Sequence, residues 1–152
     1  MVFVTNIGIE LGIRAPIEAI ERAAQIADNN SVEYFLVPET HPEFFGVDAL
    51  ETILKISKKI KHLKLGTGII NIFSRTQEEI LDYANKIYEK TDGKFVLGIG
   101  TSAPIIIEKL WKMEFKKPVS RLKDYSNFIR SGFHGQIYWA AIGEKTTKLA
   151  AE

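Results

Sequence analysis

Apolar segments of strand length alternate along the chain with segments whose apolar residues recur at helical spacing. The apolar segments, which predict β-strands, span residues 2–11, 32–38, 63–73, 94–101 and 136–143. The segments with helical spacing, which predict α-helices, span residues 16–29, 48–62, 76–91, 121–130 and 144–152. An irregular stretch is expected between the fourth strand and the fourth helix, at 102–119.

Residues that favour helix starts stand at the expected positions. Pro16 suits the first turn of the first helix, because its missing N–H would be unpaired there anyway. Asp48 is followed three residues later by Glu51, and Thr76 is followed at the same spacing by Glu79. Both pairs predict capping boxes at helix N-termini.

The alternation of strands and helices, with strands that are continuously apolar, is typical of parallel β-strands covered by helices. Open doubly wound sheets and (β/α)₈ barrels both fit this pattern. The 152 residues predict a single domain, 1–152, which would amount to about five of the eight units of a barrel. The last helix has no glycine or other stop signal, which favours a barrel that is shortened on its C-terminal side.

The composition narrows the classes of partner. The net charge of +1 gives no reason to expect nucleic acid or an anionic membrane surface as a partner. The absence of cysteine excludes disulfides, thiolate catalysis and cysteine-ligated metals, and it fits a cytoplasmic protein. Neither a membrane span nor a signal peptide is expected. Abundant Lys, Glu and Ile lean towards a thermophilic source.

Ligands of parallel α/β proteins bind at the carboxyl ends of the strands, so the residues there are the candidates for function. Taken strand by strand, they are Glu10, residues 39–41, residues 71–75, residues 100–102 and residues 143–147. Glu39 and His41 bring a carboxylate and an imidazole together, which allows acid–base chemistry, although a solvated polar loop is the alternative. No metal site is predicted, because His41 has no second histidine at ligand spacing.

Two glycine-rich segments at strand ends could bind phosphate through backbone N–H groups. The segment "GIGTS" (98–102) is not the dinucleotide-binding fingerprint, and the spacing in "GEKTTKL" (143–149) favours an ordinary capped helix over a phosphate site. Their candidate residues are Gly100, Thr101, Gly143, Thr146 and Thr147.

The third predicted strand, within "LKLGTGIINIFSR" (63–75), is interrupted by Gly66 and Gly68 and carries Asn71 among apolar residues. Glycine in a strand interior marks a bulge or a close approach to the backbone. The sequence therefore predicts that something packs against this strand.

Four segments, in chain order, resemble the bacterial luciferase-like superfamily of flavin-dependent monooxygenases and coenzyme F420-dependent reductases. The segment "VEYFLVPETH" is similar to the family's second strand with its acidic–histidine motif, and "IKHLKLGTGIINIFSRTQEEI" is similar to its third strand. The segments "YEKTDGKFVLGIGTS" and "YWAAIGEKTTKLAAE" are similar to its fourth and fifth strands.

The resemblance implies a parallel (β/α) barrel of the TIM type, with about five of its eight units present. It implies an oxidoreductase that uses FMN or coenzyme F420 for hydride transfer or monooxygenation of a small organic substrate. The ring would pack on a bulge in the third strand, with a cis peptide bond between Gly68 and Ile69 and with Asn71 near the polar edge of the ring.

The same resemblance implies that the cofactor phosphate binds at Gly143, Thr146 and Thr147, and that Glu39 or His41 donates a proton. The sequence departs from the family pattern after the second strand. There the histidine follows the acidic residue after one intervening residue, Thr40, instead of directly.

Two other hypotheses remain open. The chain could be a shortened, non-catalytic relative that forms a homodimer or a higher homo-oligomer to cover the edges of an open sheet. It could also bind a phosphate-bearing ligand without any flavin. In each case a small molecule or a second copy of the chain is the expected partner.

Overall fold

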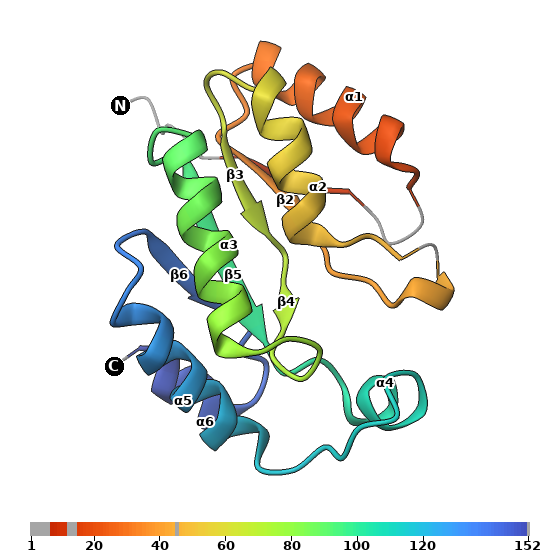
Figure 1. The fold of residues 1–152 in the computed structure, drawn as a ribbon, viewed down its shortest axis with the longest axis vertical. Coiled ribbons are helices and arrows are strands. Elements are labelled where there is room, and N and C mark those ends of the chain that lie inside the picture. The colour runs from red at the N-terminus through yellow and green to blue at the C-terminus, as the bar shows by residue number, and fades with distance from the viewer. Residues whose placement is uncertain (1–6, 12–14, 45, 152) are drawn as a thin grey trace.

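The computed structural model describes residues 7–11, 15–44 and 46–151, which form a parallel sheet covered by helices (Figure 1). The strands are β1 (Gly8–Glu10), β2 (Tyr34–Val37), β3 (Lys64–Thr67), β4 (Ile70–Asn71), β5 (Phe95–Gly100) and β6 (Gln136–Trp139). The α-helices are α1 (Ile17–Asn29), α2 (Ala49–Ile56), α3 (Gln77–Lys90), α4 (Pro104–Lys109), α5 (Pro118–Arg130) and α6 (Glu144–Ala150). Two short 3₁₀ helices are η1 (Pro42–Phe44) and η2 (Ser57–Lys59).

The strands pair in chain order, and every pairing is parallel. β1 pairs with β2, β2 with β3, β3 and β4 with β5, and β5 with β6. Because β3 and β4 are two halves of one interrupted strand, the sheet has the strand order of about five of the eight units of a (β/α)₈ barrel. The predicted fold class is therefore confirmed.

The core lies between the sheet and four helices, α1, α2, α3 and α5, which lie side by side over one face (Figure 1). Phe35, Leu65 and Leu97 point from the sheet into this layer, and Ile53 and Ile80 meet them from α2 and α3, all five fully buried. Burying each such side chain contributes about 1.5–3 kcal/mol. No helix in the described part of the chain is both long and apolar enough to cross a lipid bilayer.

Several predicted boundaries differ from the structure. The predicted strand 63–73 is interrupted at Gly68–Ile69, and the predicted strand 136–143 ends at Trp139. The stretch 102–119 is not irregular throughout, since it contains α4 and since α5 begins early, at Pro118, a residue suited to a first helical turn. Residues 2–6 of the first predicted strand lie outside the described residues.

The helix starts follow the predicted caps with two exceptions, the capping box of Asp48 and Glu51, which forms in one direction only, and the position of Pro16. The capping box of Thr76 and Glu79 is present in both directions, and the Asp48 side chain accepts a hydrogen bond from the Glu51 N–H at 2.9 Å. Pro16 stands one residue outside α1, as its N-cap, with an extended backbone. The predicted helix 48–62 ends as an α-helix at Ile56 and continues only as η2.

A buried carboxylate joins the end of α1 to the start of β3. Asp28 accepts hydrogen bonds from the backbone N–H groups of Lys61, His62 and Leu63 at 2.9, 2.8 and 2.8 Å. Burial alone would raise the pKa of Asp28, but these three N–H groups outweigh it and lower the pKa below its ordinary value. The charged form of Asp28 is therefore the one that stabilises the fold.

We expect Asp28→Ala to lower the free energy of unfolding by about 2–3 kcal/mol at neutral pH, because one buried and two partly buried N–H groups lose their acceptor. Since the folded-state pKa of Asp28 is lowered, its contribution is present above the unfolded-state pKa of about 3.9 and is lost as pH falls through the folded-state value. Urea unfolding at about pH 7 and about pH 2.5 measures both effects.

The matched control is Asp82→Ala, which removes an exposed carboxylate 3.7 Å from Lys86 on α3 and should change stability by less than about 0.5 kcal/mol. A loss for Asp28→Ala that is no larger than that of the control, or that is equally large at both pH values, would contradict this account.

Candidate functional site

The predicted bulge is present where β3 passes into β4. On one side of it Gly66 pairs with Val96. On the other side Ile70 pairs with Ile99, so three residues of the β3–β4 segment oppose two residues of β5. The peptide bond between Gly68 and Ile69, inside the bulge, is cis, which confirms the prediction for this bond.

A threonine side chain replaces the strand pairing that the bulge interrupts. The Thr67 hydroxyl accepts a hydrogen bond from the Gly98 N–H and donates one to the Gly98 carbonyl oxygen, both at 2.8 Å. Position 98 has no room for a side chain, because a Cβ there would lie 2.1 Å from the Thr67 carbonyl oxygen. The bulge therefore depends on this pair of residues.

The bulge is also tied to the end of β2. The Gly68 N–H donates to the Val37 carbonyl oxygen at 2.9 Å, and the Glu39 N–H donates to the Ile69 carbonyl oxygen at 3.3 Å. Backbone hydrogen bonds thus hold the residues on both sides of the cis bond. They also fix the start of the loop that follows β2.

A cavity of about 490 Å³ lies beside the bulge at the carboxyl ends of the strands. Eight of the predicted site residues line it: Glu39, His41, Gly68, Ile69, Asn71, Thr101, Gly143 and Thr146. Glu10 and Ser102, which were strand-end candidates without an assigned role, also line it, together with residues that were not predicted: Pro38, Ala103, Ile106, Trp111, Ala140 and Ile142. The expectation that ligands bind at the carboxyl ends of the strands therefore identified, from five separate segments, most of the residues of one site.

Two predicted residues, Gly100 and Thr147, do not line the cavity. Gly100 is buried beneath it, where a Cβ would lie 2.9 Å from the Ala140 Cβ and 3.0 Å from the Ile69 Cδ1, so packing explains the glycine. The exposed Thr147 hydroxyl donates to the Gly143 carbonyl oxygen at 3.1 Å, within its own helix. Neither residue presents a group to the cavity.

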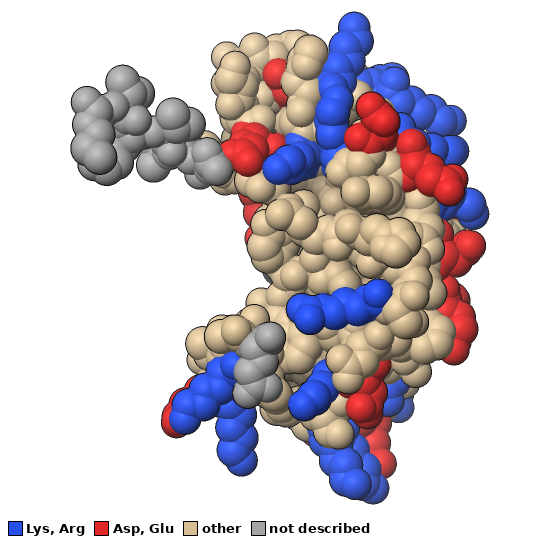
Figure 2. All heavy atoms as spheres, turned by 90° about the vertical axis from the view of Figure 1, so that its left-hand side faces the viewer, with Lys and Arg blue, Asp and Glu red and all other residues tan. Residues whose placement is uncertain are grey.

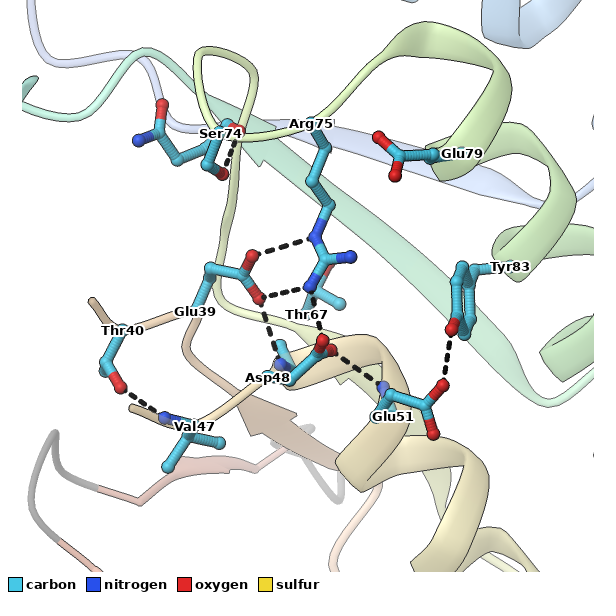
Figure 3. A network of polar contacts seen from close by, with 12 residues as sticks. Glu39, Thr40, Val47, Asp48, Glu51, Thr67, Ser74, Arg75, Glu79 and Tyr83 are labelled. Carbon is cyan, nitrogen blue, oxygen red and sulfur yellow. Dashed lines mark hydrogen bonds and ion pairs between the residues drawn. The ribbon is translucent and has the colours of Figure 1, made fainter. Parts of the chain in front are cut away.

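Glu39, which lines the cavity, belongs to a network of charged side chains with Arg75 and Asp48 (Figure 3). Its side chain, 4% exposed, accepts hydrogen bonds from Arg75 Nε at 2.8 Å and from the Ala49 N–H at 3.0 Å. Arg75 also pairs with Asp48 at 2.8 Å. These contacts supply a donor to both carboxylate oxygens of Glu39 and hold its side chain against Arg75 and the N-terminus of α2.

Arg75 remains a cation in this network. Burial alone would lower its pKa, but hydrogen bonds and the charges of Glu39 and Asp48 raise the pKa above its ordinary value. The network thus joins the end of β2, the N-terminus of α2 and the turn after β4, as Figure 3 shows.

His41, and not Thr40, faces the cavity. The Thr40 hydroxyl accepts a hydrogen bond from the Val47 N–H at 2.6 Å, across the base of the loop. His41 Nδ1 accepts the Glu43 N–H at 3.3 Å, which assigns the proton of a neutral imidazole to Nε2. No described residue accepts from Nε2, and the ring meets Trp111 edge-on, with centroids 4.7 Å apart. His41 therefore has a donor to offer a ligand.

Asn71 brings a second donor to the cavity wall. Its side chain is buried, with 5% of the residue exposed, and its Oδ1 accepts the Phe73 N–H at 3.0 Å. This contact fixes the orientation of the amide. Asn71 Nδ2 has no hydrogen-bond acceptor among the described residues. A buried N–H group without an acceptor costs about 1–3 kcal/mol, so the geometry suits a ligand that supplies an acceptor.

Glu10 is the cavity residue that the motifs missed, although the strand-end rule included it. Its carboxylate stands over the bulge, with Oε2 3.3 Å from the place that a Cβ on Gly68 would take. Burial raises the pKa of Glu10 above its ordinary value. Trp111 was noted in the sequence only as an aromatic residue that could cover the strand ends, and Ile106 carried no signal, because it lies in the stretch that was expected to be irregular.

A parallel (β/α) sheet with a cavity at its carboxyl ends defines an α/β protein of the TIM-barrel class. The sequence profile described as luciferase-like monooxygenase matches residues 1–148, so the chain belongs to the luciferase-like family. The predicted family is thereby confirmed.

A protein of Mycobacterium tuberculosis, named as a coenzyme F420-dependent oxidoreductase, is 27% identical over 88 residues, which are 58% of this chain and 25% of that protein. The chain therefore spans much less than the full length of this relative.

Two solved structures share the fold. The coenzyme F420-dependent tetrahydromethanopterin reductase of Methanopyrus kandleri has a TM-score of 0.72 at 18% identity, over 82% of this chain and 39% of that one. The oxygenating constituent of 3,6-diketocamphane monooxygenase from Pseudomonas putida, in complex with FMN, has a TM-score of 0.71 at 12% identity, over 83% and 38%.

We expect Gly98→Ala to lower the free energy of unfolding by at least about 2 kcal/mol, because the new methyl group would overlap the backbone of Thr67. Gly143→Ala is the matched control, since a Cβ there would meet only the Thr146 hydroxyl, at 3.8 Å, and φ is −89°. Urea unfolding of both variants measures the difference, and equal losses would show that the bulge does not need glycine at position 98.

Proposed function

We propose that the chain provides the ring-binding part of a luciferase-like oxidoreductase that uses FMN or coenzyme F420 to transfer hydride to, or oxygenate, a small organic substrate. The fold and the family are established by the comparisons above, whereas the cofactor and the reaction are inferred. The redox-active ring would supply the hydride or oxygen chemistry.

The observation that carries this proposal is Asn71 Nδ2, a buried donor without an acceptor in the wall of a cavity that the bulge also lines. The pyrimidinedione edge shared by the isoalloxazine and deazaflavin rings offers carbonyl oxygens, which are suitable acceptors. Because Gly68 has no side chain, a planar ring could also lie close against this wall of the cavity. The residues present therefore fit a ring of this kind.

The chain's own residues would bind and orient the reactants. Asn71 would fix the polar edge of the ring, and Trp111 and Ile106 would exclude water at the cavity mouth. His41 is the better-placed proton donor, because its Nε2–H has no described acceptor while Glu39 is held by Arg75. Gly143 and Thr146 line the same cavity and remain the predicted phosphate contacts.

The names of the similar proteins are consistent with the use of either cofactor, FMN or coenzyme F420. The mycobacterial relative and the Methanopyrus reductase are named for coenzyme F420, whereas the Pseudomonas monooxygenase was solved with FMN. The chain spans only 25–39% of the length of these proteins, so their activities and substrates are not assigned to it.

A second candidate function is that of a shortened, non-catalytic relative that self-associates. The observation that favours it is the pair of open sheet edges, since in the described residues β1 pairs only with β2, and β6 only with β5. Open edges and exposed apolar side chains such as Tyr138, 49% exposed, promote association with further strands.

We expect purified chain to bind FMN or coenzyme F420, detected as a change in the ring's absorption and fluorescence. Asn71→Asp keeps the acceptor for the Phe73 N–H but loses the free donor, so ring affinity should fall by about 10- to 100-fold. Asn71→Ala, which removes the donor without adding a charge, should weaken binding in the same direction.

Asn127→Asp, an exposed change on α5, is the matched control and should bind within about twofold of the unchanged chain. No spectral change with either ring would refute the proposed cofactor use. If that result came together with a stable dimer in sedimentation, it would support the non-catalytic alternative. Unchanged affinity in both Asn71 variants would remove the role assigned to Asn71.

A further inference from the structure

The charges around the cavity are unevenly balanced. Among the described residues that line it, the ionisable side chains are Glu10, Glu39 and His41, and there is no lysine or arginine. Glu39 is neutralised by Arg75, which lies behind the wall. Among the described lining residues, Glu10 is therefore the carboxylate that has no cationic partner.

A second cavity, of about 480 Å³, lies on the face of the sheet away from the helices. Figure 2 shows this side of the molecule as an indentation in the outline, with mostly uncharged residues visible around it, whereas charges gather on the helical side. Its lining is mainly apolar, with Leu36, Val96 and Trp139 among the residues. Glu10 is the one formally charged side chain that lines it among the described residues.

Glu10 stands where the two cavities meet. Both are lined by Glu10, Gly68, Ile69 and Ala140, so a single ligand can contact the bulge and extend into either space. The neighbouring strands present no cation to this carboxylate. Lys64, at the start of β3, is on the same face of the sheet, the one away from the helices. Its side chain contacts Tyr34 and Glu33 and not Glu10.

Glu10 is an exposed residue whose side chain has no hydrogen bond or ion pair with any described residue, and its partial burial raises its pKa. A solvent-exposed carboxylate gains a modest stabilisation from a ligand that donates N–H bonds, and the gain is largest with a cationic ligand. The same carboxylate repels a phosphate or carboxylate group of a ligand.

We propose that Glu10 is a substrate-binding residue that selects molecules with an ammonium or other N–H donor group attached to an apolar body. The donor group pairs with the Glu10 carboxylate beside the bulge, and the apolar body occupies the hydrophobic cavity. This inference rests on the proposed function, since it names the substrate class of the same site, but its test does not require a redox cofactor.

The test uses three small probes of equal chain length: n-butylammonium, n-butanol and butyrate. Each is titrated into isotope-labelled full-length chain at pH 7, and the amide resonances of Gly68 and Ile69 report binding. We expect the ammonium probe to bind about fivefold more tightly than the alcohol, and butyrate to bind most weakly.

Glu10→Gln and Glu10→Ala should bring the affinities for the ammonium and alcohol probes to within about twofold of each other. Glu33→Gln is the matched control, because it removes a nearby carboxylate that pairs with Lys64 at 3.7 Å, and it should preserve the full preference. Dispersed amide spectra show that each variant is folded.

Three results would overturn the inference: no preference for the ammonium probe, a preference that survives both Glu10 variants, or tightest binding of butyrate. The titration is made without FMN or coenzyme F420. Failure to bind either ring would therefore defeat the proposed function alone, and failure of the amine preference would defeat this inference alone.

Discussion

The two hydrogen bonds between the Thr67 hydroxyl and the backbone of Gly98 hold the arrangement on which the candidate site depends. They substitute for the strand pairing that is lost where β3 gains one residue over β5. The extra residue shifts the register, so that Gly68 and Ile69 form a wall of the cavity and Asn71 follows in the same wall. A regular strand would place these residues one position away and on the opposite face.

The charged side chains near the cavity fall into two groups, those that pair with one another and those that have no described partner. Glu39 and Asp48 both pair with Arg75 and fix the loop that carries His41. Asn71 and Glu10, whose Nδ2 and carboxylate have no described partners, both line the cavity. A ligand can supply an acceptor to the buried Asn71 Nδ2 and a donor to the exposed Glu10, and both residues lie next to the bulge.

The sequence predicted the fold well, because apolar periodicity and capping residues such as Thr76 and Glu79 act locally. The bulge was predicted from Gly68 together with the family resemblance. The partner of Glu39 was not predicted, because Arg75 lies 36 residues away and only the packed fold brings them together. Gly100 was assigned to the cofactor because a glycine-rich turn looks the same whether packing or a ligand requires it.

The central claim is that the bulge is one wall of a ring-binding site, and a crystal structure of the chain grown with FMN, and in parallel with coenzyme F420, tests it most directly. The account predicts a ring that lies against Gly68 and Ile69, with a carbonyl oxygen at hydrogen-bond distance from Asn71 Nδ2. A ring bound elsewhere on the molecule, with the cavity beside the bulge empty, would contradict it.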